Sequence, residues 1–309
     1  MIRCLVLLCV VLLIGCETSR QGGTKPARGE PVEVRAPVVV RGDSGAAASW
    51  PEIVAACAGA DVVLVGENHG HAIGLAFAAD LFDAIVAKAP DAILSMEFFE
   101  RDTQSAIDDY LAGLSDDATF RRRTFRTDGN YPPGHQRMVA TAKEHGRIIL
   151  AANAPRIYVR LARTAGYDRL ETLTPLQQTL FELPTEMPTG RYREEFERVM
   201  SGMAGHGPAV GTPEHAEMIE SIYRSQTLWD STMADSIARA LREGHRPIVH
   251  VVGRFHIDHE GGLTQLLREA APDARIVSVT TAPTWSSVLL EADRDRADFV
   301  VYVGPVAQE

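Results

Sequence analysis

Aromatic side chains and basic charge are both scarce in this sequence. Phe, Trp and Tyr make up 6% of the 309 residues, too few for the stacking surface that single-stranded nucleic acids need. The formal net charge is -10, from 31 basic and 41 acidic residues, so the chain lacks the overall positive potential that attracts nucleic-acid phosphates. These two deficits argue against a nucleic-acid-binding protein.

Apolar runs long enough to cross a membrane are also missing. The run Leu5–Ile14 is interrupted only by Cys9, and about ten apolar residues fall short of the ~20 that a bilayer needs. The whole sequence is 45% hydrophobic and 23% charged, which is typical of a globular protein. This composition excludes a disordered chain, a coiled coil and a multi-span membrane protein, and the length predicts one large domain or two small ones.

The amino terminus has the pattern of a bacterial lipoprotein signal. Arg3 precedes the apolar run, which ends at Leu13-Ile14-Gly15-Cys16. A small residue followed by cysteine is the lipobox, so we expect residues 1–15 to be removed and Cys16 to be acylated. The alternative is an uncleaved anchor or a chance cysteine. Glu17 after the cysteine favours sorting to the outer membrane of a Gram-negative bacterium.

Cysteine is scarce enough to exclude an intrachain disulfide in the mature protein. Of the four cysteines, Cys4 and Cys9 leave with the signal peptide and Cys16 takes the lipid. Only Cys57 remains. It stands among small apolar neighbours, and we expect it to be a buried small hydrophobic residue.

The chain after the signal divides into a tether and a folded domain. Residues 16–48 begin with the lipidated cysteine and are rich in Gly, Pro, Ala, Arg and Ser, a composition that predicts a flexible link to the membrane. The folded domain is expected over residues 49–309. No internal repeat divides it.

Short β-branched runs alternate with amphipathic stretches along the domain, which predicts an α/β fold with a mostly parallel sheet and helices on both faces. We predict strands over 61–65, 92–96, 147–151, 247–252, 275–280 and 298–303. We predict helices over 71–89, 102–113, 135–145, 155–165, 191–203 and 213–243. Residues 166–244 show no strand pattern and are expected to form a small inserted helical subdomain.

Ionisable and amide side chains follow four of these strands. Glu67 and His69 follow the first, Glu97 the second, Asn153 and Arg156 the third and His256 the fourth. Ligands of open parallel sheets bind beyond the carboxyl ends of the strands. The sequence therefore predicts a site at the edge of the sheet where the carboxyl ends of the strands meet, which we call the rim. Each residue alone could be an ordinary polar group of a loop.

Two chemistries are open for the rim. His69, Glu97 and His256 form a mixed nitrogen and oxygen set that suits Zn, Mn or Fe. The alternative is that they make hydrogen bonds without a metal. The sequence contains no His-Glu-x-x-His, no Gly-x-Ser-x-Gly and no phosphate-binding Gly-x-x-x-x-Gly-Lys, so an ordinary serine hydrolase is disfavoured.

The long helix over 213–243 carries polar residues on an otherwise apolar stripe. His215, Gln226 and Asp230 share that stripe with Ile219 and Met233. Buried polar groups without partners cost about 1–3 kcal/mol each. We expect these three side chains either to tie the helix to the rim loops or to line a pocket.

A basic cluster stands before a stiff loop in the middle of the chain. Its arginines are 121, 122, 123 and 126, which form either a solvated helix face or partners for ligand carboxylates such as haem propionates. The loop reads Tyr131-Pro132-Pro133-Gly134-His135. Tyr131 and His135 are both candidate axial iron ligands.

An ordered set of short motifs carries a family resemblance over roughly residues 50–280. After the lipobox, the motifs are Gly66-Glu67-Asn68-His69, Glu97-Phe98, Gln104 with Tyr110-Leu111-Ala112-Gly113, Ala152-Asn153-Ala154-Pro155-Arg156, Gln226, Trp229-Asp230, Met233-Ala234 and Gly253-Arg254-Phe255-His256. The set resembles the ChaN-type haem-binding lipoproteins. That family belongs to a broader group with the Tiki and TraB-type proteins and is similar to the erythromycin esterases.

The resemblance implies a parallel α/β domain that binds haem at its surface, in a homodimer that sandwiches the haem, with a role in haem or iron acquisition. It implies Tyr131 as the iron ligand, with Asn153, Arg156, His215, Gln226 and Asp230 as further cofactor-binding candidates. Relatives with enzymatic activity share the Glu/His rim. The alternative function is therefore a hydrolase that uses Glu67, His69, Glu97 and His256, with or without a divalent metal.

Overall fold

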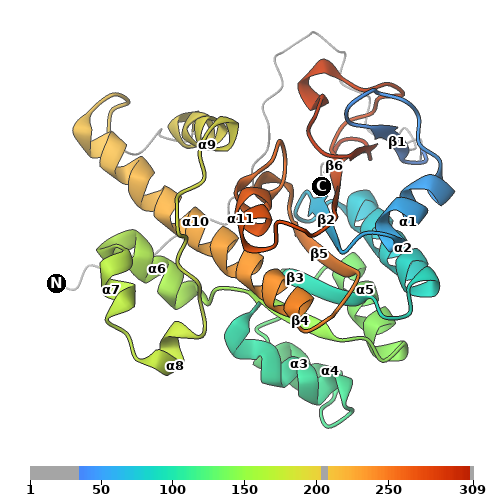
Figure 1. Ribbon diagram of the computed structural model, residues 1–309, viewed down its shortest axis with the longest axis horizontal. Coiled ribbons are helices and arrows are strands. Elements are labelled where there is room, and N and C mark those ends of the chain that lie inside the picture. Colours follow the sequence, from blue (N-terminus) through green and yellow to red (C-terminus); the bar gives the residue numbers. More distant parts are fainter. Residues whose placement is uncertain (1–34, 203–207, 307–309) are drawn as a thin grey trace. The chain divides into compact units, whose positions relative to one another are not determined.

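A central parallel sheet organises the computed structural model, which describes residues 35–202 and 208–306 (Figure 1). The strands are β1 Val38–Arg41, β2 Val62–Glu67, β3 Ile93–Glu100, β4 Ile149–Asn153, β5 Ile248–Gly253, β6 Ile276–Ala282 and β7 Phe299–Tyr302. Their order across the sheet is β1-β7-β6-β2-β5-β3-β4. Only β1 runs antiparallel to its neighbour. The α/β prediction is confirmed.

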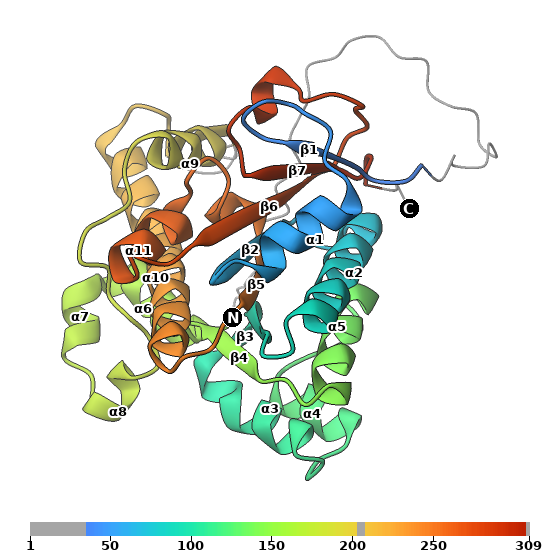
Figure 2. The same ribbon diagram turned by 45° about the vertical axis from the view of Figure 1, so that its right-hand side comes forward.

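Helices cover both faces of this sheet, as Figure 2 shows. They are α1 Trp50–Ala58, α2 Ala72–Lys88, α3 Gln104–Leu111, α4 Asp117–Arg123, α5 Pro133–Glu144, α6 Arg156–Ala165, α7 Tyr167–Glu171, α8 Pro175–Gln178, α9 Arg191–Gly202, α10 Pro213–Arg242 and α11 Gly262–Ala270. Successive strand residues point to opposite faces. Val63 and Val65 of β2 therefore pack toward α1, α2 and α5, whereas Val62 and Leu64 pack toward α10 and α11.

The six predicted strands correspond to β2 through β7, and β1 is the one that the sequence analysis misses. The tether is predicted to run to residue 48, but Val38–Arg41 pair with Phe299–Tyr302 at the edge of the sheet. Four residues are too few to show a hydrophobic period. The folded unit accordingly begins at Pro37 and not at residue 49.

Helix α10 belongs to two packing layers at once. It begins after Thr212, whose hydroxyl accepts a hydrogen bond from the amide of His215. Leu228 packs among the helices of the predicted insert, while Met233 and Ile237 pack against the sheet. The described part of residues 166–244 contains helices and loops only. Because one long helix spans both layers, the insert and the sheet are joined through it.

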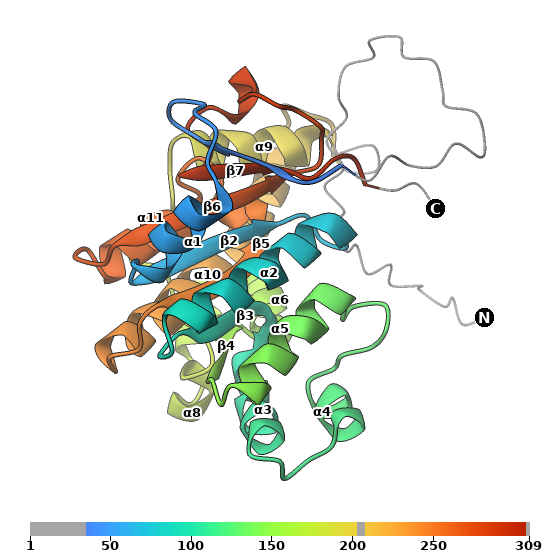
Figure 3. The same cartoon turned by 90° about the vertical axis from the view of Figure 1, so that its right-hand side faces the viewer.

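Helices α3 and α4 lie beyond the β4 edge of the sheet (Figure 3). Among residues 35–202 and 208–306, no helix is long and apolar enough to cross a membrane. The predicted signal peptide and Cys16 lie outside the described residues. Cys57 is a buried free thiol of α1, and burial raises its pKa to about 12, as expected for a small hydrophobic residue in the core.

Candidate functional site

The carboxyl ends of β2, β3 and β5 meet at one rim of the sheet. Glu67 ends β2 and lies in register with Gly253, the last residue of β5. Glu97 lies in β3, where the pairing with β4 is irregular between Met96 and Glu100. Because the strands are parallel, their final side chains converge, as the sequence predicts.

Glu67 is held between two imidazole rings. Its Oε1 is 3.0 Å from Nδ1 of His69, and its Oε2 is 2.6 Å from Nε2 of His135. Burial of Glu67 opposes ionisation, but the two histidines outweigh it and lower its pKa to about 2. The ring of His69 also loses hydration, yet Glu67 and Glu97 raise its pKa to about 9. At neutral pH this corner therefore holds a carboxylate and an imidazolium.

His135 is not presented as an open ligand in this structure. Its ring is 1% exposed, Nε2 is bonded to Glu67, and Nδ1 is enclosed without a hydrogen-bond partner among the described atoms. The ring of Phe98 packs against it at a centroid distance of 4.1 Å and also contacts the ring of His69 edge-on. His135 therefore belongs to the Glu67 corner of the rim.

Gly253 brings His69 and Glu97 together. Its amide donates to Oε2 of Glu97 over 2.6 Å. A Cβ at this position would stand 2.9 Å from Nε2 of His69 and 3.4 Å from Oε2 of Glu97. The absence of a side chain thus lets the imidazole ring lie directly on the backbone at the end of β5.

A second histidine is oriented from the long helix. Nδ1 of His256 lies 2.5 Å from Oδ1 of Asp230, and its Nε2 lies 3.7 Å from Oε1 of Glu97. Burial opposes protonation of His256, but the two carboxylates raise its pKa. Gln226 reaches the same ring, with Nε2 3.2 Å from Nδ1. Gln226 and Asp230 therefore tie α10 to the rim, which was one of the two roles predicted for them.

Tyr192 completes this second cluster and was not predicted from the sequence. Its hydroxyl donates to Oδ2 of Asp230 over 2.6 Å and accepts from Nε2 of Gln226 over 3.1 Å. A Cβ on Gly262 would stand 2.3 Å from Oδ2 of Asp230, so this glycine makes room for the pair. Tyr192 comes from α9, and no motif or spacing in the sequence connects it to Asp230.

The remaining predicted residues lie in three different places. Asn153 supports the rim, because its Nδ2 donates to the carbonyl of Glu97 over 3.0 Å. The side chain of Arg156 is 76% exposed and contacts Glu100. His215 is 6% exposed near the start of α10, and the helical rise separates it from Gln226 by about 16 Å. His215 therefore does not share the His256 cluster.

The basic cluster and Tyr131 lie next to each other. The side chain of Arg121 pairs with Asp117 and Asp128 and stacks over the Tyr131 ring at 5.1 Å. The Tyr131 ring is 3% exposed and packs against Phe120. Burial raises the pKa of its hydroxyl, while nearby arginines counteract part of that effect.

A metal centre at the rim gains no support from the structure. Among the described residues, no group of three or more His, Cys, Asp or Glu side chains is arranged to hold a metal ion. Glu97 accepts from the Gly253 amide, and His256 is bonded to Asp230. The rim is instead a hydrogen-bonded acid–base network.

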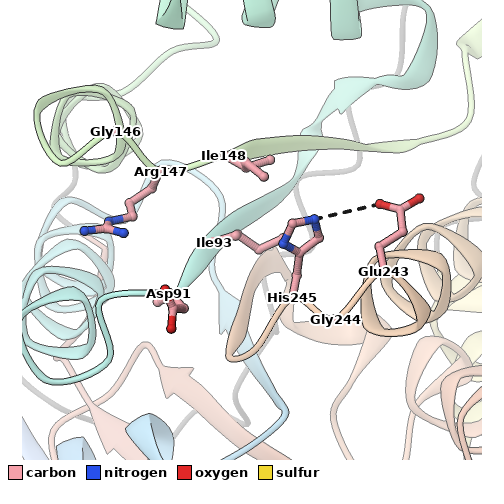
Figure 4. A pocket seen from close by; sticks show the side chains of 9 residues that line it. Asp91, Ile93, Gly146, Arg147, Ile148, Glu243, Gly244 and His245 are labelled. Atoms are coloured by element: carbon pink, nitrogen blue, oxygen red, sulfur yellow. Dashed lines mark ion pairs between the residues drawn. The ribbon is translucent and has the colours of Figure 1, made fainter.

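A hollow lies at the opposite end of the strands from the rim. It has a volume of about 300 Å³ and lies at the amino ends of β3 and β4, and in it Nε2 of His245 is 3.8 Å from Oε2 of Glu243. Figure 4 shows the side chains that line it. Arg147 and Asp91 also line it. Ligands of open parallel sheets bind at the other end, so we place the candidate site at the rim.

Fold and rim define an α/β protein with a paired Glu/His site at the carboxyl edge of its sheet. A family model described as haem-binding uptake, Tiki superfamily, ChaN matches residues 53–267. The chain therefore belongs to this family, as the motif set implied. Comparison with the curated proteins finds no match for this sequence.

Solved structures resemble this one to different degrees, and the first of the following shares its fold. The structure of cofacial haem binding to ChaN of Campylobacter jejuni matches with a TM-score of 0.67 and 14% identity, over 86% of this chain and 96% of that one. An erythromycin esterase variant in its open conformation matches with a TM-score of 0.44 and 13% identity, over 86% and 83%. A Bacillus cereus protein matches with a TM-score of 0.43 and 11% identity, over 84% and 94%.

Proposed function

We propose that this protein binds haem and serves its uptake at the cell envelope. Membership of the haem-binding uptake family, over residues 53–267, is the observation that carries the proposal. The donor set of this chain suits the group. Tyrosinate and imidazole both ligate haem iron, and the domain places Tyr131 and His69 on the side of the sheet covered by α2 and α5.

Tyr131 is the iron ligand that we propose. Burial raises the pKa of the Tyr131 hydroxyl, and Arg121 and Arg126 oppose that effect only in part. The ring is buried here, so ligation needs the loop that carries it to open. His135 is disfavoured because Glu67 holds its Nε2.

A titration of hemin into the full-length protein in detergent tests this assignment. We expect a saturable visible spectrum, loss of its ligand-to-metal charge-transfer band in Tyr131→Phe, and an unchanged spectrum in His135→Ala and in the control His245→Ala. Retention of the band in Tyr131→Phe, with loss in His69→Ala, would transfer the ligand role to His69. A wild-type protein that leaves the hemin spectrum unchanged would overturn haem binding.

We further propose that Cys16 carries lipid and anchors the protein in the outer membrane. The charge, apolar length and Gly15-Cys16 ending of the amino terminus support this. Labelling of cells with a palmitate analogue should mark the wild-type chain and not Cys16→Ser. Membrane fractionation then separates the inner from the outer membrane.

We also propose that haem is bound between two copies of the chain, as a homodimer. The cofacial haem of the Campylobacter jejuni protein motivates this stoichiometry. Light scattering before and after hemin addition should show a doubling of mass. An unchanged monomer mass at saturation would contradict the arrangement.

One observation favours hydrolysis as a second candidate function. A Cβ built on Gly253 would lie within 3.4 Å of both His69 and Glu97, so the two side chains face the same small space. Glu67 orients His69, and His256 lies beside Glu97. Glu97 could take a proton from an attacking water, while the imidazolium of His69 gives one to the leaving oxygen.

A panel of small ester and amide substrates distinguishes this candidate from haem binding. If hydrolysis is the function, Glu97→Gln and His69→Ala should each reduce turnover by about 10²-fold or more. The control His245→Ala should retain it. Absence of turnover with every substrate, or equal turnover in all variants, would leave the rim with a structural role.

A further inference from the structure

A small surface patch around Glu100 combines cations with exposed apolar side chains. Glu100 is the last residue of β3, and Arg126 and Arg156 both act on its charge. Phe125 and Ile157, their sequence neighbours, are each 65% exposed. We call these five residues the Glu100 patch. It stands out in a chain whose net charge is -10.

Phe125 is held outward by its backbone. Its φ of 58° lies in the left-handed region, which a bulky residue rarely adopts. Asn130 secures this turn, since its Nδ2 donates to the carbonyl of Phe125 over 3.0 Å and its Oδ1 accepts from the amide of Thr127 over 2.7 Å. The same loop leads directly to Tyr131.

Arg126 is fixed while keeping part of its guanidinium available. Nε donates to the carbonyl of Thr124 over 2.9 Å, and the group lies over the Phe99 ring at 5.8 Å. Tyr131 contributes to the electrostatic environment of Arg126, which places the patch beside the proposed iron ligand.

Arg156 is loosely held by Glu100. Its Nε lies 3.4 Å from Oε1, and its amide donates to Oε2 over 3.3 Å, while the side chain stays 76% exposed. An exposed contact of this length contributes little stability. A ligand carboxylate could therefore take the place of Glu100 at small cost, and gain paired hydrogen bonds from guanidinium.

We propose that the Glu100 patch is the propionate-binding part of the haem site. Arg126 and Arg156 bind the two carboxylates, Phe125 and Ile157 cover the adjoining apolar edge of the porphyrin, and Glu100 holds the arginines in position until haem replaces it. This inference rests on the proposed haem binding. It assigns the two propionates of haem to Arg126 and Arg156, which are 30 residues apart in the sequence.

Hemin and its dimethyl ester provide the test, because the ester retains the iron and the apolar ring but lacks both negative charges. Binding of each is measured by quenching of tryptophan fluorescence in the full-length protein in detergent. Wild type should prefer hemin over the ester by about tenfold or more, given the usual strength of a charged hydrogen bond. Arg156→Ala should abolish most of that preference, because it should weaken the binding of hemin and leave the binding of the ester unchanged.

Two matched variants complete the design. Arg122→Ala removes an exposed cation of the neighbouring helix α4 whose guanidinium donates to the hydroxyl of Thr119, and it should keep the preference for hemin. Glu100→Gln removes the competing carboxylate. It should raise the affinity for hemin several-fold and leave the affinity for the ester unchanged. Since the Arg156 side chain is mostly exposed, loss of folding is not expected.

The outcomes separate this inference from the haem proposal. If wild type binds neither compound, haem binding itself fails. If wild type binds hemin with a charge-transfer band but Arg156→Ala and Arg126→Ala retain the full preference over the ester, haem binding stands and the Glu100 patch is overturned. If Arg122→Ala and Arg156→Ala weaken hemin binding equally, the inference is likewise overturned, because nonspecific attraction between surface cations and the propionates would then explain the effect.

Discussion

The Nε2 atom of His135 donates a hydrogen bond to Oε2 of Glu67 over 2.6 Å, and both side chains are almost fully buried. This bond joins the start of α5 to the end of β2. It also leaves the other carboxylate oxygen of Glu67 to His69. One buried acid thus orients the exposed histidine of the rim from behind and is itself held by a second, buried histidine.

Glu67→Gln should lower the free energy of unfolding by about 3 kcal/mol, because the buried ring of His135 and the ring of His69 both lose the carboxylate to which they are bonded. Urea denaturation measures this change. Glu260→Gln is the control, since Glu260 pairs with Arg268 on the surface, with its own side chain 60% exposed, and should cost less than ~1 kcal/mol. Equal losses in the two variants would contradict a special role for Glu67.

The folded protein should become less stable at alkaline pH, because His69 loses its proton there. Its pKa is about 9 in the folded protein, against about 6.5 in an unfolded chain. The stabilisation is fully present below pH ~6.5 and is lost as the pH rises through ~9. We expect a loss of about 1 kcal/mol, since more than a third of the side chain is exposed and solvent screens the interaction. The His69→Ala variant should lack this decline; a profile identical to wild type would refute the assignment.

Gly253→Ala should displace the His69 ring, because the added Cβ would lie 2.9 Å from its Nε2. The ring then moves away from Glu67, and its pKa should drop toward the ordinary value. Histidine side-chain NMR across a pH titration measures this. Gly202→Ala is the matched control, since a Cβ there meets open space, and an unaltered His69 titration in Gly253→Ala would show that the contact is unimportant.

Asp230→Asn and Tyr192→Phe should be strongly coupled in a double-mutant cycle. Asp230→Asn should cost about 3 kcal/mol, because the buried Nδ1 of His256 loses the carboxylate to which it is bonded. Tyr192→Phe should cost about 1–2 kcal/mol, because the hydrogen bonds to Asp230 and from Gln226 are both lost. Because both changes affect the same carboxylate, the double variant should cost less than their sum. Additive losses, measured by urea unfolding, would show that the hydroxyl acts elsewhere.

Much of the fold could be predicted because it follows from local hydrophobic patterns. The strand β2 reads as a continuous apolar run, which is what a strand buried on both faces requires. The helix over 213–243 agrees with α10 to within one residue. β1 could not be found this way, since its place depends on β7, more than 250 residues away in the chain, and not on its own composition.

The site was predictable to the extent that parallel strands bring their ends together. Glu67, His69, Glu97 and His256 meet at the rim for that reason. Tyr192 was not predicted, because α9 reaches Asp230 through helix packing that has no local signature. The sequence makes His135 one of two candidate iron ligands and gives no sign of the Glu67 carboxylate that faces it in the structure.

The sequence by itself determined the parallel α/β architecture, the set of ionisable residues at the strand ends and the family, because each depends on local pattern or on ordered motifs. Only the tertiary structure decided the pairings. Glu67 is bound by two histidines, Gly253 leaves room for His69 beside Glu97, and Glu100 contacts Arg156. These relationships set charge and proton affinity, which depend on distance and burial in space and not on position along the chain.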